Sequence, residues 1–311
     1  MTYLDQNWGH PWVFLAGLLA LVVHVHGLRA LNWRSNRERA RRRRHRMLLS
    51  IAGITLATLS VCSPLEYWSM QYFWIHMLQH ITVMLAAPAL YVAGNPALPL
   101  VFAIPVATRR RLMRVMNLSR SLSWLRQLFH FVSSTRFAVI SFNVVMVVWM
   151  IPGPFDFVMK SESLHIGLML SSFLFTGILF WTKILSSYPF KAIEMPLPRA
   201  GALLVTNLVM TIVAMSISIF TTTADYRFPP MMMVMGSVVM PMTTVTMNRL
   251  VDQQIGAAIL WVCGDFWCLP ALIFAIHSAL KDGTDANLVD RFLRGREQAA
   301  PTAVLTGRGR K

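Results

Sequence analysis

Charged residues are scarce in this chain, and acidic ones most of all. Only 14% of its 311 residues are Asp, Glu, Lys or Arg, with 13 acidic against 29 basic residues, while 55% are hydrophobic. Apolar segments long enough to cross a bilayer recur along the chain. This composition is not that of a soluble domain and predicts a multi-spanning membrane protein. We interpret the net charge of +16 as basic inner loops beside anionic lipid, not as a nucleic-acid-binding surface.

Signatures of several other protein classes are also missing. The cysteines Cys62, Cys263 and Cys268 form no CxxC pair, and their odd number argues against a disulfide framework. No HExxH, GxSxG, Walker A or GxGxxG motif stands in a suitable context, so the sequence predicts no enzymatic activity. No basic segment precedes the first apolar run, as it would in a cleavable signal peptide. We therefore expect that run to be an uncleaved anchor with its N-terminus outside.

The apolar segments predict an all-α bundle of seven transmembrane helices within a membrane domain of residues 1–280. The spans cover about residues 11–31, 47–63, 74–95, 137–151, 163–184, 199–221 and 255–280. A basic amphipathic stretch at 107–130 is expected on the inner surface. A Met-rich stretch at 229–250 is expected outside, at the interface or re-entering the membrane. Residues 281–311 are predicted to form a basic, partly disordered cytoplasmic tail.

The basic residues predict the orientation of the bundle. With seven spans and the N-terminus outside, the outer segments hold only Lys160, Arg227 and Arg249 of the 29 Lys and Arg residues. All the others fall on the inner side, as the positive-inside rule requires of a cytoplasmic face. An eighth span within 231–247 would place the basic tail outside, so we reject it.

A histidine pair in the third span is the first chemical feature. His76 and His80 are four residues apart, so on a helix both imidazoles lie on one face. His165 and Met169, also four apart, begin the fifth span on the same side of the membrane. Imidazole and thioether together favour Cu(I), whereas calcium and magnesium require oxygen ligands. These four residues are therefore the predicted ligands of a copper site at the outer leaflet.

Further polar candidates lie on or near the seventh span. Asp252 and Gln253 come just before its outer start, where we expect them to orient an imidazole by hydrogen bonding. Asp265 lies about ten residues into the span, ~15 Å from its outer end at the rise of a helix. A carboxylate at this depth is costly, so Asp265 indicates either a hydrogen-bonded packing role or an ion pathway.

Three motifs resemble a known membrane family. They are the His76–His80 run followed by Ala87-Pro88 and Gly94-Asn95-Pro96, the Asp252–Ala257 run followed by Trp261, and the block from Trp149 through Asp156 to His165. Across about residues 10–280 the chain is similar to the CtaG-like cytochrome c oxidase assembly proteins. It departs from their pattern at Met150, where the family usually has a histidine, and at Leu168-Met169, where a Glu-His pair is frequent. Methionine at both places is compatible with Cu(I).

The resemblance implies a bacterial plasma-membrane protein that helps insert copper into a haem–copper oxidase. Its partners would be oxidase subunits and an outer-face copper donor. By motif match, the carried-over site positions are His76, His80, His165, Asp252 and Gln253.

Three other functions are compatible with the same residues. His76 or His80, together with His165, could hold haem in a membrane redox protein. A copper transporter would use a pathway past Asp265, and a scaffold for oxidase subunits would bind no metal.

Overall fold

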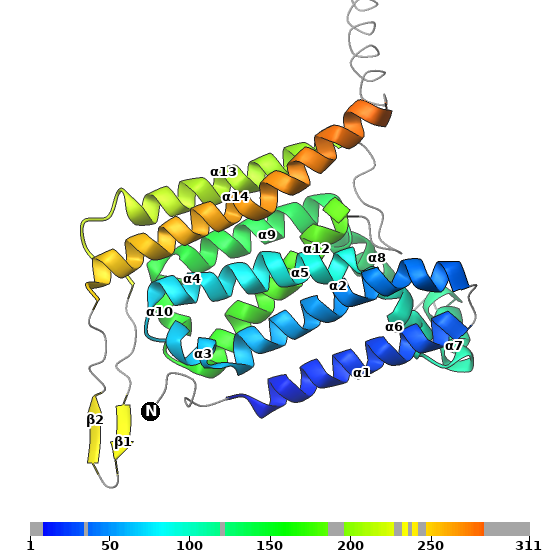
Figure 1. Cartoon of the computed structure of the whole chain (residues 1–311), viewed down its shortest axis with the longest axis horizontal. Coiled ribbons are helices and arrows are strands. Elements are labelled where there is room, and N and C mark those ends of the chain that lie inside the picture. The colour runs from blue at the N-terminus through cyan, green and yellow to red at the C-terminus, as the bar shows by residue number, and fades with distance from the viewer. Residues whose placement is uncertain are drawn as a thin grey trace, which may run out of the picture.

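The chain folds into a bundle of long helices with a short hairpin at one end (Figure 1). The computed structural model describes residues 9–33, 37–118, 122–185, 196–226, 232–235, 238–241 and 247–282. The predicted tail lies outside the described residues, apart from its first two positions, which end the last helix.

Helices account for nearly all of the described residues. The first half of the chain forms α1 (Pro11–Trp33), α2 (Arg37–Cys62), α3 (Pro64–Ser69), α4 (Phe73–Ile81), η1 (Thr82–Ala86), α5 (Ala87–Ala93), α6 (Ala97–Ala103), α7 (Val106–Leu118) and α8 (Ser123–Val132). The second half forms α9 (Thr135–Met150), α10 (Pro152–Val158), α11 (Glu162–Leu164), η3 (His165–Leu170), α12 (Ser171–Leu185), α13 (Pro196–Ser218) and α14 (Arg249–Asp282).

Five helices of the described part are long and apolar enough to cross a membrane, and the bent pair α8 and α9 makes a sixth candidate. The predicted helical membrane bundle is thereby confirmed. The apolar part of α2, Arg46–Cys62, is shorter than the five long helices. In the span Phe73–Ala93, 78% of the apolar window is buried, against 22% in α1, so the span that carries the histidine pair lies at the centre.

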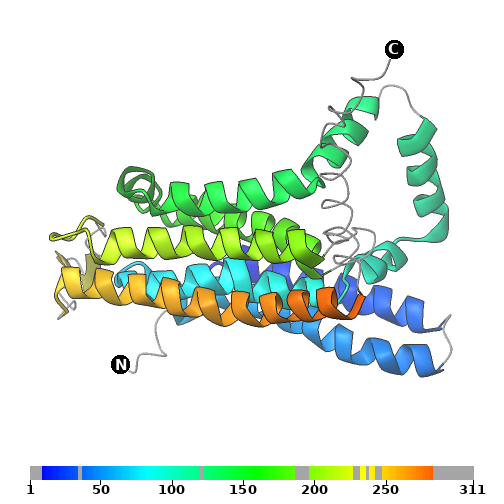
Figure 2. The same ribbon diagram turned by 90° about the horizontal axis from the view of Figure 1, so that it is seen from above.

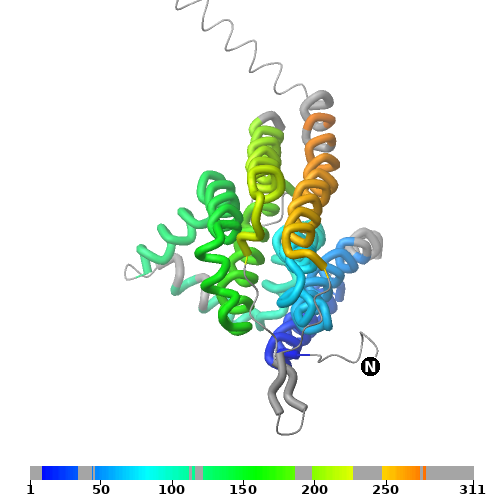
Figure 3. Tube along the Cα trace, turned by 90° about the vertical axis from the view of Figure 1, so that its left-hand side faces the viewer, coloured from blue at the N-terminus to red at the C-terminus, as the bar shows by residue number. Residues whose placement is uncertain are grey.

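The bundle has a clear layout around this central span. Viewed along its length (Figure 3), α13 and α14 lie at one edge and α1 at the opposite edge. The central α4 packs against α14, while α12 packs against both α5 and α9. The basic stretch predicted at 107–130 forms α7 and α8, which reach away from the bundle in Figure 2. Helix α8 meets α9 at an angle of 64°.

Both of the spans that carry the candidate ligands contain a π-helical turn. In η1 the backbone N–H of Ala87 donates to the carbonyl oxygen of Thr82, and in η3 the N–H of Ser171 donates to that of Ile166. Helix α12 lies directly on η1 at Gly177, where an added Cβ would overlap the carbonyl oxygen of Met84. A glycine is therefore required for this close approach. Such π-turns are frequent at functional sites because they redirect side chains from the regular helical positions.

The hairpin is formed by β1 (Met232–Met235) and β2 (Val238–Pro241), which pair antiparallel with Met232 opposite Pro241. It projects from the end of the bundle at which α14 begins (Figure 1). These eight residues are the middle of the predicted Met-rich stretch, and they form strands; its position at the interface or within the membrane stays a prediction. Within that stretch, residues 229–231, 236–237 and 242–246 lie outside the described part.

Candidate metal centre

Three histidines from two spans meet inside the bundle. His76 and His80 come from α4, and His165 begins η3; all three side chains are 0% exposed. The ring centroids of His76 and His80 lie 4.1 Å apart, and that of His165 lies 4.8 Å from His76 and 6.1 Å from His80. Each ring offers a nitrogen within 4.8 Å of the other two. We call this group the histidine cluster.

Hydrogen bonds orient two of the three rings. The Nδ1 atom of His165 lies 2.8 Å from Oε1 of Glu66, and Nδ1 of His76 lies 3.2 Å from the carbonyl oxygen of Ser69. A carbonyl oxygen only accepts, so Nδ1 of His76 is the donor in that bond. A carboxylate likewise favours a proton on Nδ1 of His165. The neutral tautomer with the proton on Nδ1 leaves Nε2 deprotonated, which is the form that a metal ligand requires.

The free ring nitrogens fit a bound metal ion. Within the described part of the chain, Nε2 of His165 and both ring nitrogens of His80 have no hydrogen-bond partner, although all are buried. Buried polar atoms are normally paired, and coordination would satisfy them. Metal–imidazole bonds of about 2.0 Å place two ligand nitrogens of one ion roughly 3.3–4 Å apart. Small ring movements are therefore sufficient for the cluster to close on an ion.

Glu66 and Gln79 support the cluster, and sequence reasoning did not identify either. The Nε2 amide of Gln79 donates to Oε2 of Glu66 and, at 2.7 Å, to the carbonyl oxygen of Ser60. Both carboxylate oxygens of Glu66 are thus engaged, and its side chain is 2% exposed. The available signal was a carboxylate in apolar surroundings, together with a glutamine inside the His-Met-Leu-Gln-His run.

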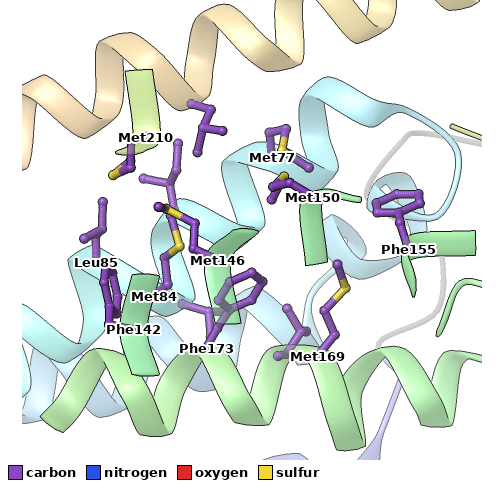
Figure 4. Close-up of a cluster of buried hydrophobic side chains, with 14 of the residues drawn as sticks. Met77, Met84, Leu85, Phe142, Met146, Met150, Phe155, Met169, Phe173 and Met210 are labelled. Carbon is purple, nitrogen blue, oxygen red and sulfur yellow. The ribbon is translucent and has the colours of Figure 1, made fainter. Parts of the chain in front are cut away.

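The two methionines lie in the packed core around the cluster. Met169 is 0% exposed and Met150 is 4% exposed, and both belong to the buried hydrophobic cluster of Figure 4, which also includes Met77 and Phe155. Phe155 also contacts the His76 ring, at 5.0 Å between centroids. Met169 follows His165 on η3, so its thioether is the nearest soft donor along that turn.

Met150 has a second contact, through its backbone. Its carbonyl oxygen accepts a hydrogen bond of 2.6 Å from the hydroxyl of Tyr226, which lies in the loop after α13. Burial, followed by the nearby charges of Asp225 and Asp156, raises the pKa of Tyr226 well above its ordinary value. The hydroxyl therefore stays protonated and remains a donor. This bond ties the end of α9 to the loop between α13 and α14.

Asp252 and Gln253 form hydrogen bonds with backbone groups. We had expected their side chains to orient an imidazole. The Asp252 carboxylate accepts from the N–H groups of Phe73 and Trp74, at 2.9 and 3.0 Å. Those N–H groups belong to the first turn of α4 and have no partner inside the helix, so Asp252 caps the helix that carries the histidine pair. Gln253 bonds to the Ile217 carbonyl and accepts from the N–H of Asp225, which fixes the end of α13.

Asp265 has a partner on the neighbouring helix. Its Oδ1 atom accepts a hydrogen bond of 2.8 Å from the side-chain amide of Asn207 on α13. The bond joins α13 and α14, which pack along their length. This geometry favours the packing interpretation of Asp265.

Comparison with known protein families gives one match. The family model described as cytochrome c oxidase caa3 assembly factor (Caa3_CtaG) matches residues 22–282, which is most of the chain. The matched region contains the three histidines, Glu66 and Asp252. No curated protein and no solved structure matches the chain.

Proposed function

This chain belongs to the cytochrome c oxidase caa3 assembly factor family, and we propose that it binds copper at the histidine cluster and delivers it to the oxidase. The observation that carries the proposal is the meeting of three fully buried imidazoles whose nitrogens lie within 4.8 Å of one another. Burying these rings without a bound ion leaves nitrogens of His80 and His165 without hydrogen bonds in the described part of the chain.

The donor set explains the choice of metal. Imidazole nitrogen suits copper and zinc, and copper binds such sites more tightly than the other divalent first-row ions. The thioether of Met169 is a soft donor that favours Cu(I), and we propose it as the fourth ligand. Glu66 keeps the His165 ring in the tautomer that presents Nε2 to the ion.

Delivery requires ligand exchange and no catalysis. Copper is taken from a donor at the outer face, held by the cluster, and passed to an oxidase subunit as new ligands replace the imidazoles. In the orientation that we propose, seven spans include the shorter apolar part of α2, the N-terminus lies outside and the C-terminus in the cytoplasm. This places the cluster near the outer face of a bacterial plasma membrane, and the basic inner segments beside anionic lipid.

The test is the copper content of purified full-length protein after loading and desalting. We expect bound copper in the wild type and loss of that copper in His76→Ala/His80→Ala. His24→Leu is the matched control, since His24 is a buried membrane histidine (1% exposed) on α1, outside the cluster. Equal copper in the wild type and the double variant would overturn the site.

The haem alternative conflicts with the packing of the rings. His76 stacks on His165, and His80 lies 4.8 Å from the ring of Phe173. A porphyrin plane between these rings would have to separate them and displace the core. We therefore expect no Soret band in purified protein, which the same preparation tests by absorbance.

A further inference from the structure

A second group of possible metal ligands lies beside the histidine cluster and extends to the protein surface. His10, Glu66 and Glu162 each offer a ligand atom, and these atoms lie within 4.8 Å of one another. Nε2 of His10 is 2.7 Å from Oε1 of Glu162, and their side chains are 14% and 54% exposed. Glu66 is only 2% exposed. The group therefore runs from solvent-accessible side chains to a fully buried carboxylate.

His10 is held in place by the start of α1. Its carbonyl oxygen accepts from the N–H groups of Val13 and Phe14, at 2.9 and 3.2 Å, and from the thiol of Cys62 at 3.8 Å. Its backbone φ is 60°, in the left-handed region that non-glycine residues adopt only when their surroundings hold them there. The imidazole is thus presented to Glu162 from a backbone that is anchored to the end of α2.

Glu66 belongs to both groups of ligands. Its Oε1 atom contacts Nδ1 of His165 in the histidine cluster, while the same carboxylate lies within ligand reach of His10 and Glu162. An ion held by His10 and Glu162 would therefore reach His165 by way of one carboxylate. An exposed His–Glu pair alone is common and contributes little to stability. A buried carboxylate that connects such a pair to three buried imidazoles is not explained by surface pairing.

We propose that His10, Glu162 and Glu66 form an acceptor site that takes up copper from outside and passes it to the histidine cluster. The transfer is ligand exchange: a bond from copper to the deprotonated Nε2 of His165 forms as the bond to His10 or Glu162 breaks. The Nδ1 proton of His165 stays in its hydrogen bond to Glu66, and the ion keeps its oxidation state. Carboxylates attract the cation but bind Cu(I) weakly, so the ion can leave. This inference rests on the proposed function. His10 precedes the residues matched by the family model, so the acceptor site includes a residue outside that region.

The experiment measures copper uptake by full-length protein from the coloured Cu(I)–bicinchoninate complex. The initial rate and the end point are both read from the loss of absorbance. His10→Ala/Glu162→Ala should lower the end point only by the copper that the acceptor site itself holds. It should slow the initial rate about tenfold, the low end of rate effects from charged binding clefts. Asp156→Asn, which removes a carboxylate from α10 outside the site, should keep the wild-type rate. An unchanged rate in the double variant, or an equal slowing in Asp156→Asn, would overturn the acceptor site.

Two further variants distinguish failure of the acceptor site from failure of the histidine cluster as the copper site. In His76→Ala/His80→Ala, weakly held copper should remain, and adding His10→Ala/Glu162→Ala should remove it. An end point equal to that of the wild type in the His76→Ala/His80→Ala protein would overturn the histidine cluster as the copper site. Residual copper that disappears only with His10 and Glu162 would still support the acceptor site. Residual copper that is insensitive to them would overturn it.

Discussion

Two groups of polar side chains lie within apolar spans of this protein, one half-buried and one fully buried, and they differ in how their polar atoms are used. In one group, Asp265 on α14 accepts a hydrogen bond from Asn207 on α13, so the two polar side chains pair with each other between the helices. In the other, Glu66 bonds to His165, but ring nitrogens of His80 and His165 keep no partner in the described part of the chain. The first arrangement is a packing contact. The second arrangement leaves ring nitrogens that can coordinate a metal ion.

The difference shows that the cost of a polar side chain in a membrane does not by itself indicate function. Both groups are costly to place in an apolar span, because their polar atoms lose water. Pairing within the bundle removes that cost for Asp265 and Asn207. For the histidine cluster the cost is removed only if something enters and coordinates the free nitrogens. The partners of a polar group inside a span, rather than its presence, therefore distinguish a binding site from a structural contact.

The largest effect is expected from Glu66→Gln, which should lower the copper affinity of the histidine cluster. The amide carries no charge and holds the Nδ1 proton of His165 less strongly. Loss of such an orienting partner lowers metal affinity by about 10- to 100-fold. A competition titration against bicinchoninate measures the affinity, with Asp156→Asn as the control that should keep the wild-type value. Unchanged affinity in Glu66→Gln would show that this carboxylate does not support the site.

A smaller effect is expected from Asp252→Ala, which removes the cap of the helix that carries His76 and His80. The N–H groups of Phe73 and Trp74 lose their acceptor, and loss of a helix cap costs about 0.5–2 kcal/mol. The melting temperature in detergent should fall accordingly. Asp252→Asn keeps one of the two acceptor oxygens and should fall between the wild type and Asp252→Ala in stability. Equal melting temperatures for the wild type and Asp252→Ala would contradict the capping role.

Tyr226→Phe tests a hydrogen bond that lies next to the cluster without belonging to it. The variant loses the donor to the Met150 carbonyl, at a cost of about 1 kcal/mol. We expect a lower melting temperature together with wild-type copper content. A loss of copper in this variant would mean that the end of α9 is coupled to the metal site.

The smallest effect is expected from Asp265→Asn, the direct test of the packing contact. Hydrogen bonds between membrane helices contribute about 0.6 kcal/mol on average, and an asparagine can still accept from Asn207. Both copper content and melting temperature should stay close to the wild-type values. A fall in copper content would contradict the comparison and revive the pathway interpretation.

Much of the architecture was predictable from residue order because its causes are local. Long apolar runs predict membrane helices, and the break after Cys62 follows from Pro64, which begins α3 after the capping Ser63. The spacing of His76 and His80 predicts a shared helix face, and the ring contact at 4.1 Å confirms it. Residues 229–250 were less predictable. Their described middle forms strands, because pairing of two short segments depends on a turn and not on apolar content alone.

The candidate site was predictable only in part. The histidines were identified from their residue types and from the order of the spans. Glu66 was not, because it lies 99 positions from His165 and its apolar surroundings alone do not show which side chain it meets. The position of Asp252 at the start of the last span was correct, but its partners are the backbone N–H groups of α4, 178 and 179 positions away.

The order of residues alone was sufficient for the class of protein, the five long apolar helices, the family resemblance and the imidazole pair on one face of α4. Hydropathy and helical periodicity act over one or two turns, so neighbours in the chain carry that information. The tertiary structure decided which polar groups meet. It brought Glu66 to His165, His10 to Glu162 and Asn207 to Asp265, because these contacts depend on the close packing of separate helices. That packing rests on local details such as Gly177 against η1, whose consequences appear only when the bundle is assembled.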